Sequence, residues 1–221
     1  MIYICDDINL DYPYEELEKY VSKERLIKAL RFNERIDYAL SLTAYCLLKY
    51  GIYKETGIVL SQNTTFEYYQ HNKPKIEGID KKFNLSHSHK CVATVISNHE
   101  VGIDVEGEKN ITDNLVKFTM NKNEVIKINT DKSLFYRYWT NKESYLKLTG
   151  QGINVILTSL DFSPFNENTF SYKDAHFYSE NHSNYSLTVC SFEDQFSEND
   201  VIKLSFNELL KAMDEMINGN N

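Results

Sequence analysis

Residues 101–106, VGIDVE, alternate apolar and polar side chains as a half-buried β-strand does. The alternation places the three apolar side chains on one face and Gly102, Asp104 and Glu106 on the other. Like charges this close repel unless a metal ion, a proton or a base neutralises them. An all-oxygen donor set selects Mg²⁺ or a related hard cation over zinc. The alternative for Asp-x-Glu alone is the polar edge of a half-exposed strand.

Further strand patterns lie on either side of this stretch. Residues 82–88 and 91–96 precede it, and the loop 97–100 predicts a hairpin between 91–96 and 101–106. Later strands are predicted at 156–160 and 185–190. Strands and helices do not alternate regularly, so the fold class is predicted as α+β.

A first helix is predicted from Ser22 to Gly51, with Gly51 as its C-terminal cap. Basic residues follow one another along it at steps of three and four, which makes one positive stripe on a continuous helix. The stripe is either a solvated face or an anion-binding surface. Its members are Arg25, Lys28, Arg31 and Arg35.

A second helix is predicted from Asp131 or Ser133 to Gly150, again ending at a glycine. It carries Glu143 and Lys147, which at a spacing of four form an ordinary helix ion pair. If Glu143 instead faces Asp104 and Glu106, the carboxylates and lysine suit a metal-bound pyrophosphate. A capping box at 205–208 predicts a last, short helix, and the tail 218–221 is expected to fray.

The composition narrows the class of protein. The 221 residues are 42% hydrophobic and 25% charged, which is typical of a folded globular chain. The net charge of −8 disfavours nucleic acid as a main partner. The sequence contains no apolar run near the roughly 20 residues of a membrane span, and no secretion signal is recognisable. Four scattered cysteines fit reduced thiols, so we expect a cytoplasmic location.

The stretch Ser86-His87-Ser88-His89 allows two other interpretations. A Ser-His-Asp triad with Asp104 lacks a Gly-x-Ser-x-Gly elbow, and a zinc site lacks further spaced ligands. Hydrogen bonds from Ser86 and His87 to phosphate oxygens are favoured, with a histidine satisfied in the hairpin as the alternative.

Three ordered stretches together resemble the signatures of the surfactin-type 4′-phosphopantetheinyl transferases. They are FNLSHS at 83–88, VGIDVE at 101–106 and WTNKESYLKLTGQG at 139–152. Lys73-Pro74 is similar to the Gly-Lys-Pro element that precedes the first signature in that family, and the early basic helix is also similar.

The resemblance implies two similar α+β halves, 1–102 and 103–221, related by a pseudo-twofold axis, with coenzyme A in the cleft between them. It implies a monomer that transfers phosphopantetheine from coenzyme A to a serine of an apo acyl or peptidyl carrier protein, releasing adenosine 3′,5′-bisphosphate. The residues it assigns are Asp104, Glu106 and Glu143 for Mg²⁺, Glu143 and Lys147 for catalysis, and Lys28, Arg31, Lys73, Pro74, Ser86 and His87 for coenzyme A.

The chain departs from the family pattern at two positions. Leu40 stands where many relatives have arginine, and Asn72 stands where the Gly-Lys-Pro element has glycine. Glu124 is a further acidic candidate for the metal site or for supporting the base. The alternatives are a non-enzymatic module that binds carrier proteins or nucleotides, and a Mg²⁺-dependent hydrolase of the coenzyme A pyrophosphate.

Overall fold

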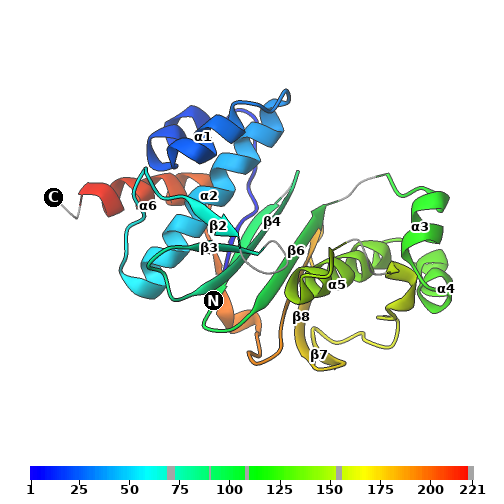
Figure 1. Cartoon of the computed structure of the whole chain (residues 1–221). Helices are drawn as coiled ribbons and strands as arrows, with labels where there is room; N and C mark the ends of the chain where they lie inside the picture. Colours follow the sequence, from blue (N-terminus) through cyan, green and yellow to red (C-terminus); the bar gives the residue numbers. More distant parts are fainter. Residues whose placement is uncertain (69–72, 90, 108–109, 153–155, 219–221) are drawn as a thin grey trace.

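The structure, a computed structural model, describes residues 1–68, 73–89, 91–107, 110–152 and 156–218 (Figure 1). Its strands are β1 (Ile2–Cys5), β2 (Phe66–Tyr68), β3 (Pro74–Ile76), β4 (Lys82–Ser88), β5 (Cys91–Ser97), β6 (Val101–Gly107), β7 (Thr169–Tyr172), β8 (Ala175–Asn181), β9 (Tyr185–Ser191) and β10 (Val201–Lys203). Its α-helices are α1 (Lys23–Ala29), α2 (Arg35–Thr56), α3 (Asp113–Thr119), α4 (Lys122–Thr130), α5 (Leu134–Thr149) and α6 (Phe206–Asn218). The structure also contains the short 3₁₀ helices η1 (Tyr14–Tyr20), η4 (Leu157–Ser159) and η5 (Glu198–Asp200).

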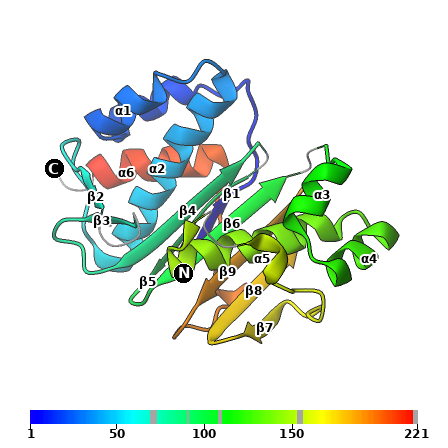
Figure 2. The same cartoon turned by 45° about the vertical axis from the view of Figure 1, so that its right-hand side comes forward.

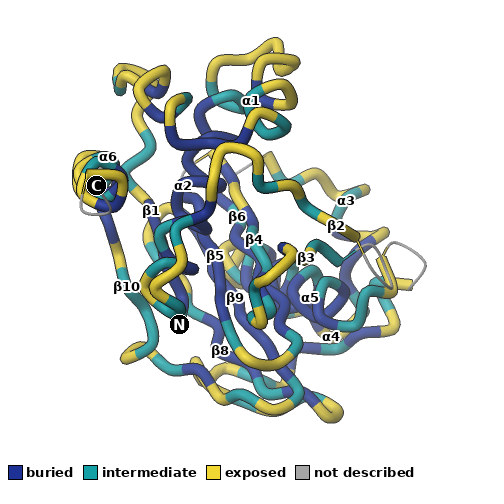
Figure 3. The backbone as a smooth tube through the Cα atoms, turned by 60° about the vertical axis from the view of Figure 1, so that its left-hand side comes forward, coloured by how far each residue is buried: buried dark blue, intermediate teal, exposed yellow. Residues whose placement is uncertain are grey.

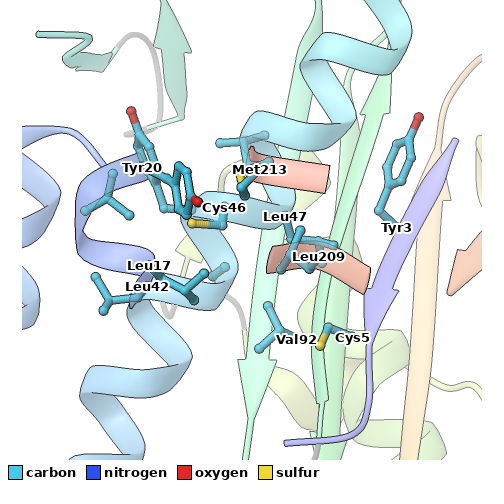
Figure 4. Close-up of a cluster of buried hydrophobic side chains, with 14 of the residues drawn as sticks. Tyr3, Cys5, Leu17, Tyr20, Leu42, Cys46, Leu47, Val92, Leu209 and Met213 are labelled. Atoms are coloured by element: carbon cyan, nitrogen blue, oxygen red, sulfur yellow. The ribbon is translucent and has the colours of Figure 1, made fainter. Parts of the chain in front are cut away.

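The first sheet has the strand order β10-β1-β5-β4. β1 runs parallel to β10 and antiparallel to β5, and β5 is antiparallel to β4. Helix α2 packs on β1, β4 and β5, and α6 packs on α2. The apolar core between them is shown in Figure 4, where the labelled side chains include Leu42, Cys46, Leu47, Val92, Leu209 and Met213.

The second sheet has the order β6-β9-β8-β7, and all of its neighbours are antiparallel. Helix α5 lies on β6, β9 and β8 (Figure 2). Aromatic side chains fill much of the space beside it: Phe177 lies 5.4 Å from Phe162 and 6.1 Å from Tyr145 between ring centroids. The large number of aromatic residues in the sequence is therefore used partly in this core.

The two sheets share a third apolar cluster, which joins them. Val101, Ile103 and Val105 of β6 pack there with side chains of β1, β5 and β9, as the alternation in 101–106 predicts. β4 also lies beside β6, where the backbone N–H of Ile103 donates to Asn84 Oδ1 at 3.2 Å. The motif strands β4 and β6 are thereby held side by side at the junction of the sheets.

Burial follows this arrangement (Figure 3). The strands at the sheet junction are buried, whereas exposed residues gather on α1 and in the connecting loops. The mixed α+β class is confirmed, and the four cysteines are free and buried. Among the described residues, no helix combines the length and the apolar character that crossing a membrane requires.

The end of the chain returns to the first sheet. β10 pairs with β1, and Phe206, Leu209 and Met213 share the core of α2. The predicted boundary between residues 102 and 103 stays a prediction. The last segment, 201–218, packs with elements from the beginning of the chain, so one cut does not describe this packing.

The prediction of one helix from Ser22 to Gly51 is wrong. α1 ends at Ala29, α2 begins at Arg35 and continues to Thr56, and Gly57 caps it in the left-handed region at φ 74°. Gly51 lies inside α2, where a Cβ would meet the side chains of Ile96 and Tyr3. This glycine therefore serves packing against the sheet rather than termination of the helix.

Two other local predictions are wrong. β5 and β6 enter different sheets instead of forming a hairpin, and part of 156–160 forms η4 rather than a strand. The predicted second helix, the strand at 185–190 and the Ser205–Glu208 capping box are confirmed by α5, β9 and the start of α6. Of the tail expected to fray, residues 219–221 lie outside the described residues.

Gly102 lets α5 approach β6 very closely. A Cβ built on it would lie 2.6 Å from the backbone nitrogen of Leu148 and closer still to the carbonyl oxygen of Ser144. Both atoms belong to the backbone of α5, so neither can rotate away as a side chain does. The glycine in VGIDVE is explained by this contact.

We expect Gly102→Ala to destabilise the protein by about 3 kcal/mol or more, because the new methyl group forces α5 off the sheet. Urea unfolding measures the change. Gly51→Ala is the matched comparison, since its close neighbours are side-chain atoms rather than backbone, and alanine favours a helix interior by about 1 kcal/mol. Equal losses in the two variants would contradict this explanation.

Candidate active site

The first and second sequence motifs meet at the carboxylate of Asp104. Ser86 Oγ on β4 donates to Asp104 Oδ1 at 2.8 Å, and both residues are buried. Lys147 Nζ on α5 donates to the same oxygen at 2.8 Å and to the carbonyl oxygen of Ile103 at 2.9 Å. Three elements that are distant in the sequence therefore converge on one side chain.

Glu143 lies one helical turn before Lys147, on the same side of α5. Burial raises the pKa of Glu143 above its ordinary value, and the negative charge of Asp104 raises it further. Lys147 lowers this pKa, and Glu106 raises it. Glu143 therefore lies near enough to both Asp104 and Glu106 for their charges to disfavour its ionisation.

The part of the chain that the structure describes contains no set of three or more His, Cys, Asp or Glu side chains arranged so that it could hold a metal ion. One oxygen nevertheless has the character of a cation ligand. Asp104 Oδ2 is buried, and within the described residues no group donates a hydrogen bond to it. Leaving such an oxygen buried is costly, by on the order of 1–3 kcal/mol or more for a charged group.

The predicted anion-binding residues of the first helix lie at α1, away from this cluster. Lys28 forms an ion pair with Glu24 at 2.8 Å, and Arg31 is exposed just beyond the helix end. Arg25 lies over the rings of Tyr45 and Phe66, at 5.8 and 5.5 Å from their centroids. Because the helix is broken, the predicted stripe is broken too.

The last member of that stripe, Arg35, is paired elsewhere. It forms an ion pair with Glu15, which lies in η1. Leu40, at the position where many relatives have arginine, is buried in the core of the first sheet. Leu40 therefore cannot supply the contact that the arginine of the relatives would make.

Lys73 and His87 have different surroundings. Lys73 Nζ donates to Glu100 and, at 2.6 Å, to the carbonyl oxygen of Leu148 near the end of α5. Pro74 begins β3, and Asn72 lies outside the described residues. His87 is exposed, next to the buried Ser86 on β4. Lys73 thus connects the β2–β3 region to α5.

Glu124, a candidate for the metal site or for supporting the base, lies in a buried ion pair. It is fully buried with Lys142, whose Nζ donates to Glu124 Oε2 at 2.6 Å and to the carbonyl oxygens of Thr119 and Leu157. Burial raises the pKa of Glu124 and lowers that of Lys142, and the attraction between the two opposes both shifts. Glu124 also accepts from the backbone N–H of Phe162 at 3.0 Å. The pair fastens α3, α4 and η4 to α5.

Sequence reasoning did not find the polar residues that hold these elements together. Asn84, Glu100 and Lys142 bond groups that are 19, 27 and 18 positions away in the chain. Asn84 and Lys142 lie within the quoted motifs, which is the one signal that pointed to them. Glu100 lies in a predicted loop and had none.

A hollow of about 1160 Å³ lies apart from the acidic cluster. It is bounded by α3, α4 and residues of η4, including Val116, Met120, Val125 and Thr158. None of Asp104, Glu106 and Glu143 lines it. The candidate active site therefore rests on the converging charged groups and not on this hollow.

Comparison with known proteins agrees with this geometry. Residues 100–198 match the family model of the 4′-phosphopantetheinyl transferase superfamily. The chain is 31% identical over 160 residues to a 4′-phosphopantetheinyl transferase of Bacillus pumilus, covering 70% of this chain and 68% of that one. It is 29% identical over 217 residues to one of Aneurinibacillus migulanus, covering 93% and 91%. A transferase of a Nostoc species is 34% identical over 161 residues, covering 66% and 68%.

These matches show that the protein is an enzyme of the transferase class. The chain belongs to the 4′-phosphopantetheinyl transferase superfamily, as the three ordered motifs suggest.

We expect Lys142→Met to lower the free energy of unfolding by about 3–5 kcal/mol, because it leaves Glu124 buried without its cation. The double variant with Glu124→Gln should lose less than the sum of the two single changes. Urea unfolding of all four proteins measures the coupling. Lys122→Met, on the exposed side of α4, is the control and should change stability by about 0.5 kcal/mol or less. Additive losses would show that the pair is not coupled.

Proposed function

We propose that this chain transfers the 4′-phosphopantetheine arm of coenzyme A to a serine of an apo acyl or peptidyl carrier protein. The reaction depends on Mg²⁺ and releases adenosine 3′,5′-bisphosphate. Membership of the superfamily supports the reaction class. The observation that carries the assignment of residues is the convergence of Ser86, Lys147 and the Glu143 charge on Asp104.

The residues proposed for Mg²⁺ are Asp104, Glu106 and Glu143. Their donors are all oxygen, which suits this hard cation, and the buried Asp104 Oδ2 has an open position for it. Bound there with the substrate, Mg²⁺ would neutralise charge on the pyrophosphate. Phosphate oxygens of coenzyme A would complete the set of ligands.

Glu143 is the proposed general base. A serine hydroxyl is a weak nucleophile at neutral pH and needs a carboxylate within hydrogen-bond reach. Glu143 accepts the proton of the carrier serine while the serine oxygen bonds to the phosphorus that bears the pantetheine. Its raised pKa, caused first by burial, increases its strength as a proton acceptor once it is ionised.

Lys147 is proposed to stabilise the leaving group. The bond from the attacked phosphorus to the bridging oxygen breaks, and the bisphosphate leaves with the electron pair. An ammonium group has three N–H donors, and Lys147 uses two of them for Ile103 and Asp104. The third remains for the developing negative charge.

The residues proposed to bind the phosphates of coenzyme A are Lys28, Arg31, Lys73 and His87. Pro74, which follows Lys73, is proposed to contact the same substrate. The Lys28–Glu24 pair is exposed and contributes little on its own, so a phosphate competes with it readily. Lys73 is held at the junction of β3 and α5, where a phosphate would meet a pre-positioned cation.

The remaining parts of the proposal follow the same resemblance. The two halves, 1–102 and 103–221, are proposed to be similar and related by a pseudo-twofold axis, with coenzyme A in the cleft between them, while residues 201–218 cross back to pack on the first half. The enzyme acts as a monomer in the cytoplasm, and its net charge of −8 disfavours nucleic acid as a partner.

We expect apo carrier proteins incubated with this enzyme, coenzyme A and Mg²⁺ to gain the mass of one phosphopantetheine group. Glu143→Gln should abolish the gain, by a factor of 10² or more in rate, because the base is lost. Mass spectrometry of a panel of acyl and peptidyl carriers measures it. Stability should not fall, because the neutral side chain relieves repulsion from Asp104 and Glu106.

Glu215→Gln is the matched control for this variant, since Glu215 is exposed on α6 and pairs only weakly with Lys211. It should transfer at the wild-type rate. No mass gain with any carrier, together with metal-independent binding of coenzyme A, would favour the binding-module alternative. Release of free phosphopantetheine in the absence of carrier would identify the hydrolase alternative.

We expect Arg31→Gln to weaken binding of coenzyme A about tenfold, because a charge-assisted bond to a phosphate is lost. Calorimetry in a chelating buffer measures this without Mg²⁺. The difference should shrink as salt rises, since exposed charges are screened. Lys211→Gln on α6 is the control. Unchanged affinity in the Arg31 variant would remove this residue from the binding site.

A further inference from the structure

The two oxygens of the Asp104 carboxylate have opposite environments. Oδ1 accepts from Ser86 Oγ and from Lys147 Nζ, both at 2.8 Å. Oδ2 is buried and receives no hydrogen bond from the residues that the structure describes. Two donors fill the ordinary capacity of one carboxylate oxygen. The carboxylate is therefore fixed with one oxygen committed and the other open.

The Ser86 hydroxyl is committed in the same way. Its side chain lies in the protein interior, with the residue 8% exposed, and Asp104 is 6% exposed. A hydroxyl has one hydrogen to donate, and here Ser86 donates it to Asp104. While this bond is formed, the hydroxyl has no hydrogen left to donate to a phosphate of coenzyme A.

The strand that carries Ser86 is bonded to both β5 and β6. Ser86 pairs with Ala93 in the β4–β5 ladder. Two residues earlier, Asn84 accepts from the Ile103 N–H, so β4 reaches two successive residues of β6 from one face. A hydroxyl placed on so constrained a strand is suited to orienting its acceptor.

We propose that Ser86 is a positioning residue for the metal ligand Asp104: its hydrogen bond to Oδ1 turns Oδ2 toward the Mg²⁺ position. This inference rests on the proposed function. It gives Ser86 a different role from the predicted one as a coenzyme A ligand, which stays a prediction. The two roles predict different effects of removing the hydroxyl. Loss of a positioning residue weakens metal binding, whereas loss of a substrate ligand weakens coenzyme A binding.

The test measures the two affinities separately for Ser86→Ala, Ser86→Thr and wild type. Calorimetry with coenzyme A in a chelating buffer gives affinity without metal. Electron paramagnetic resonance of Mn²⁺ added to the protein–coenzyme A complex gives metal affinity. We expect Ser86→Ala to weaken Mn²⁺ binding about tenfold, as loss of a group that orients a metal ligand does. Binding of coenzyme A without metal should stay within about twofold of wild type.

Ser86→Thr keeps the hydroxyl and should restore most of the Mn²⁺ affinity, which a loss of folding in Ser86→Ala would not explain. Ser88→Ala is the matched control: Ser88 lies on the same face of β4 and is also buried, and its hydroxyl has no hydrogen-bond partner within the described residues. It should change neither affinity. Thermal unfolding of each variant accompanies the measurements.

The opposite result overturns the proposal. If Ser86→Ala weakens metal-free coenzyme A binding tenfold and leaves Mn²⁺ binding unchanged, Ser86 is a substrate ligand. If the wild-type complex binds no Mn²⁺, the proposed metal role fails together with this inference, whereas the carrier assay still reports whether transfer occurs. If the wild type binds Mn²⁺ and Ser86→Ala binds it equally well, this inference alone fails.

Discussion

The site depends on how closely α5 lies on β6. At Gly102 the strand offers no side chain, so the helix backbone comes near enough for Lys147 to reach both Ile103 and Asp104. Glu143 lies four residues earlier and therefore shares that side of the helix. One packing contact thus sets the positions of the proposed base, the lysine and the proposed metal ligand at once. The apolar junction between the two sheets supports that contact from behind.

The electrostatics of the site are only partly balanced. Lys147 and Ser86 compensate the buried Asp104, but Glu143 keeps a raised pKa because burial and two neighbouring carboxylates oppose its ionisation. An arrangement selected for stability alone would not gather these charges, because each is costly to bury. Such local conflicts are expected where a ligand of opposite charge completes the site. The incomplete compensation is therefore an argument for function.

Much of the fold could be predicted from the sequence, because it depends on residues that are close to one another in the chain. The alternation of 101–106 predicts the faces of β6, and the left-handed Gly150 ends α5 where a glycine cap was expected. The order of the three motifs predicts the superfamily. The break between α1 and α2 could not be predicted, since apolar residues keep their helical spacing across it and Gly51 resembles a C-terminal cap. Only the sheet beneath α2 explains why that glycine lies inside the helix.

Pairing between distant charges was the part that the sequence could not supply, because a lysine does not specify which carboxylate it meets. The third motif illustrates this, since Lys142 and Lys147 are five residues apart. At 100° per residue they point roughly 140° apart around the helix, so they cannot serve one site. Helix geometry alone predicts that the two lysines serve different sites, but not which lysine faces which carboxylate. Packing decides it: Lys142 faces the buried Glu124, whereas Lys147 faces Asp104 of β6, where the proposed reaction would use it.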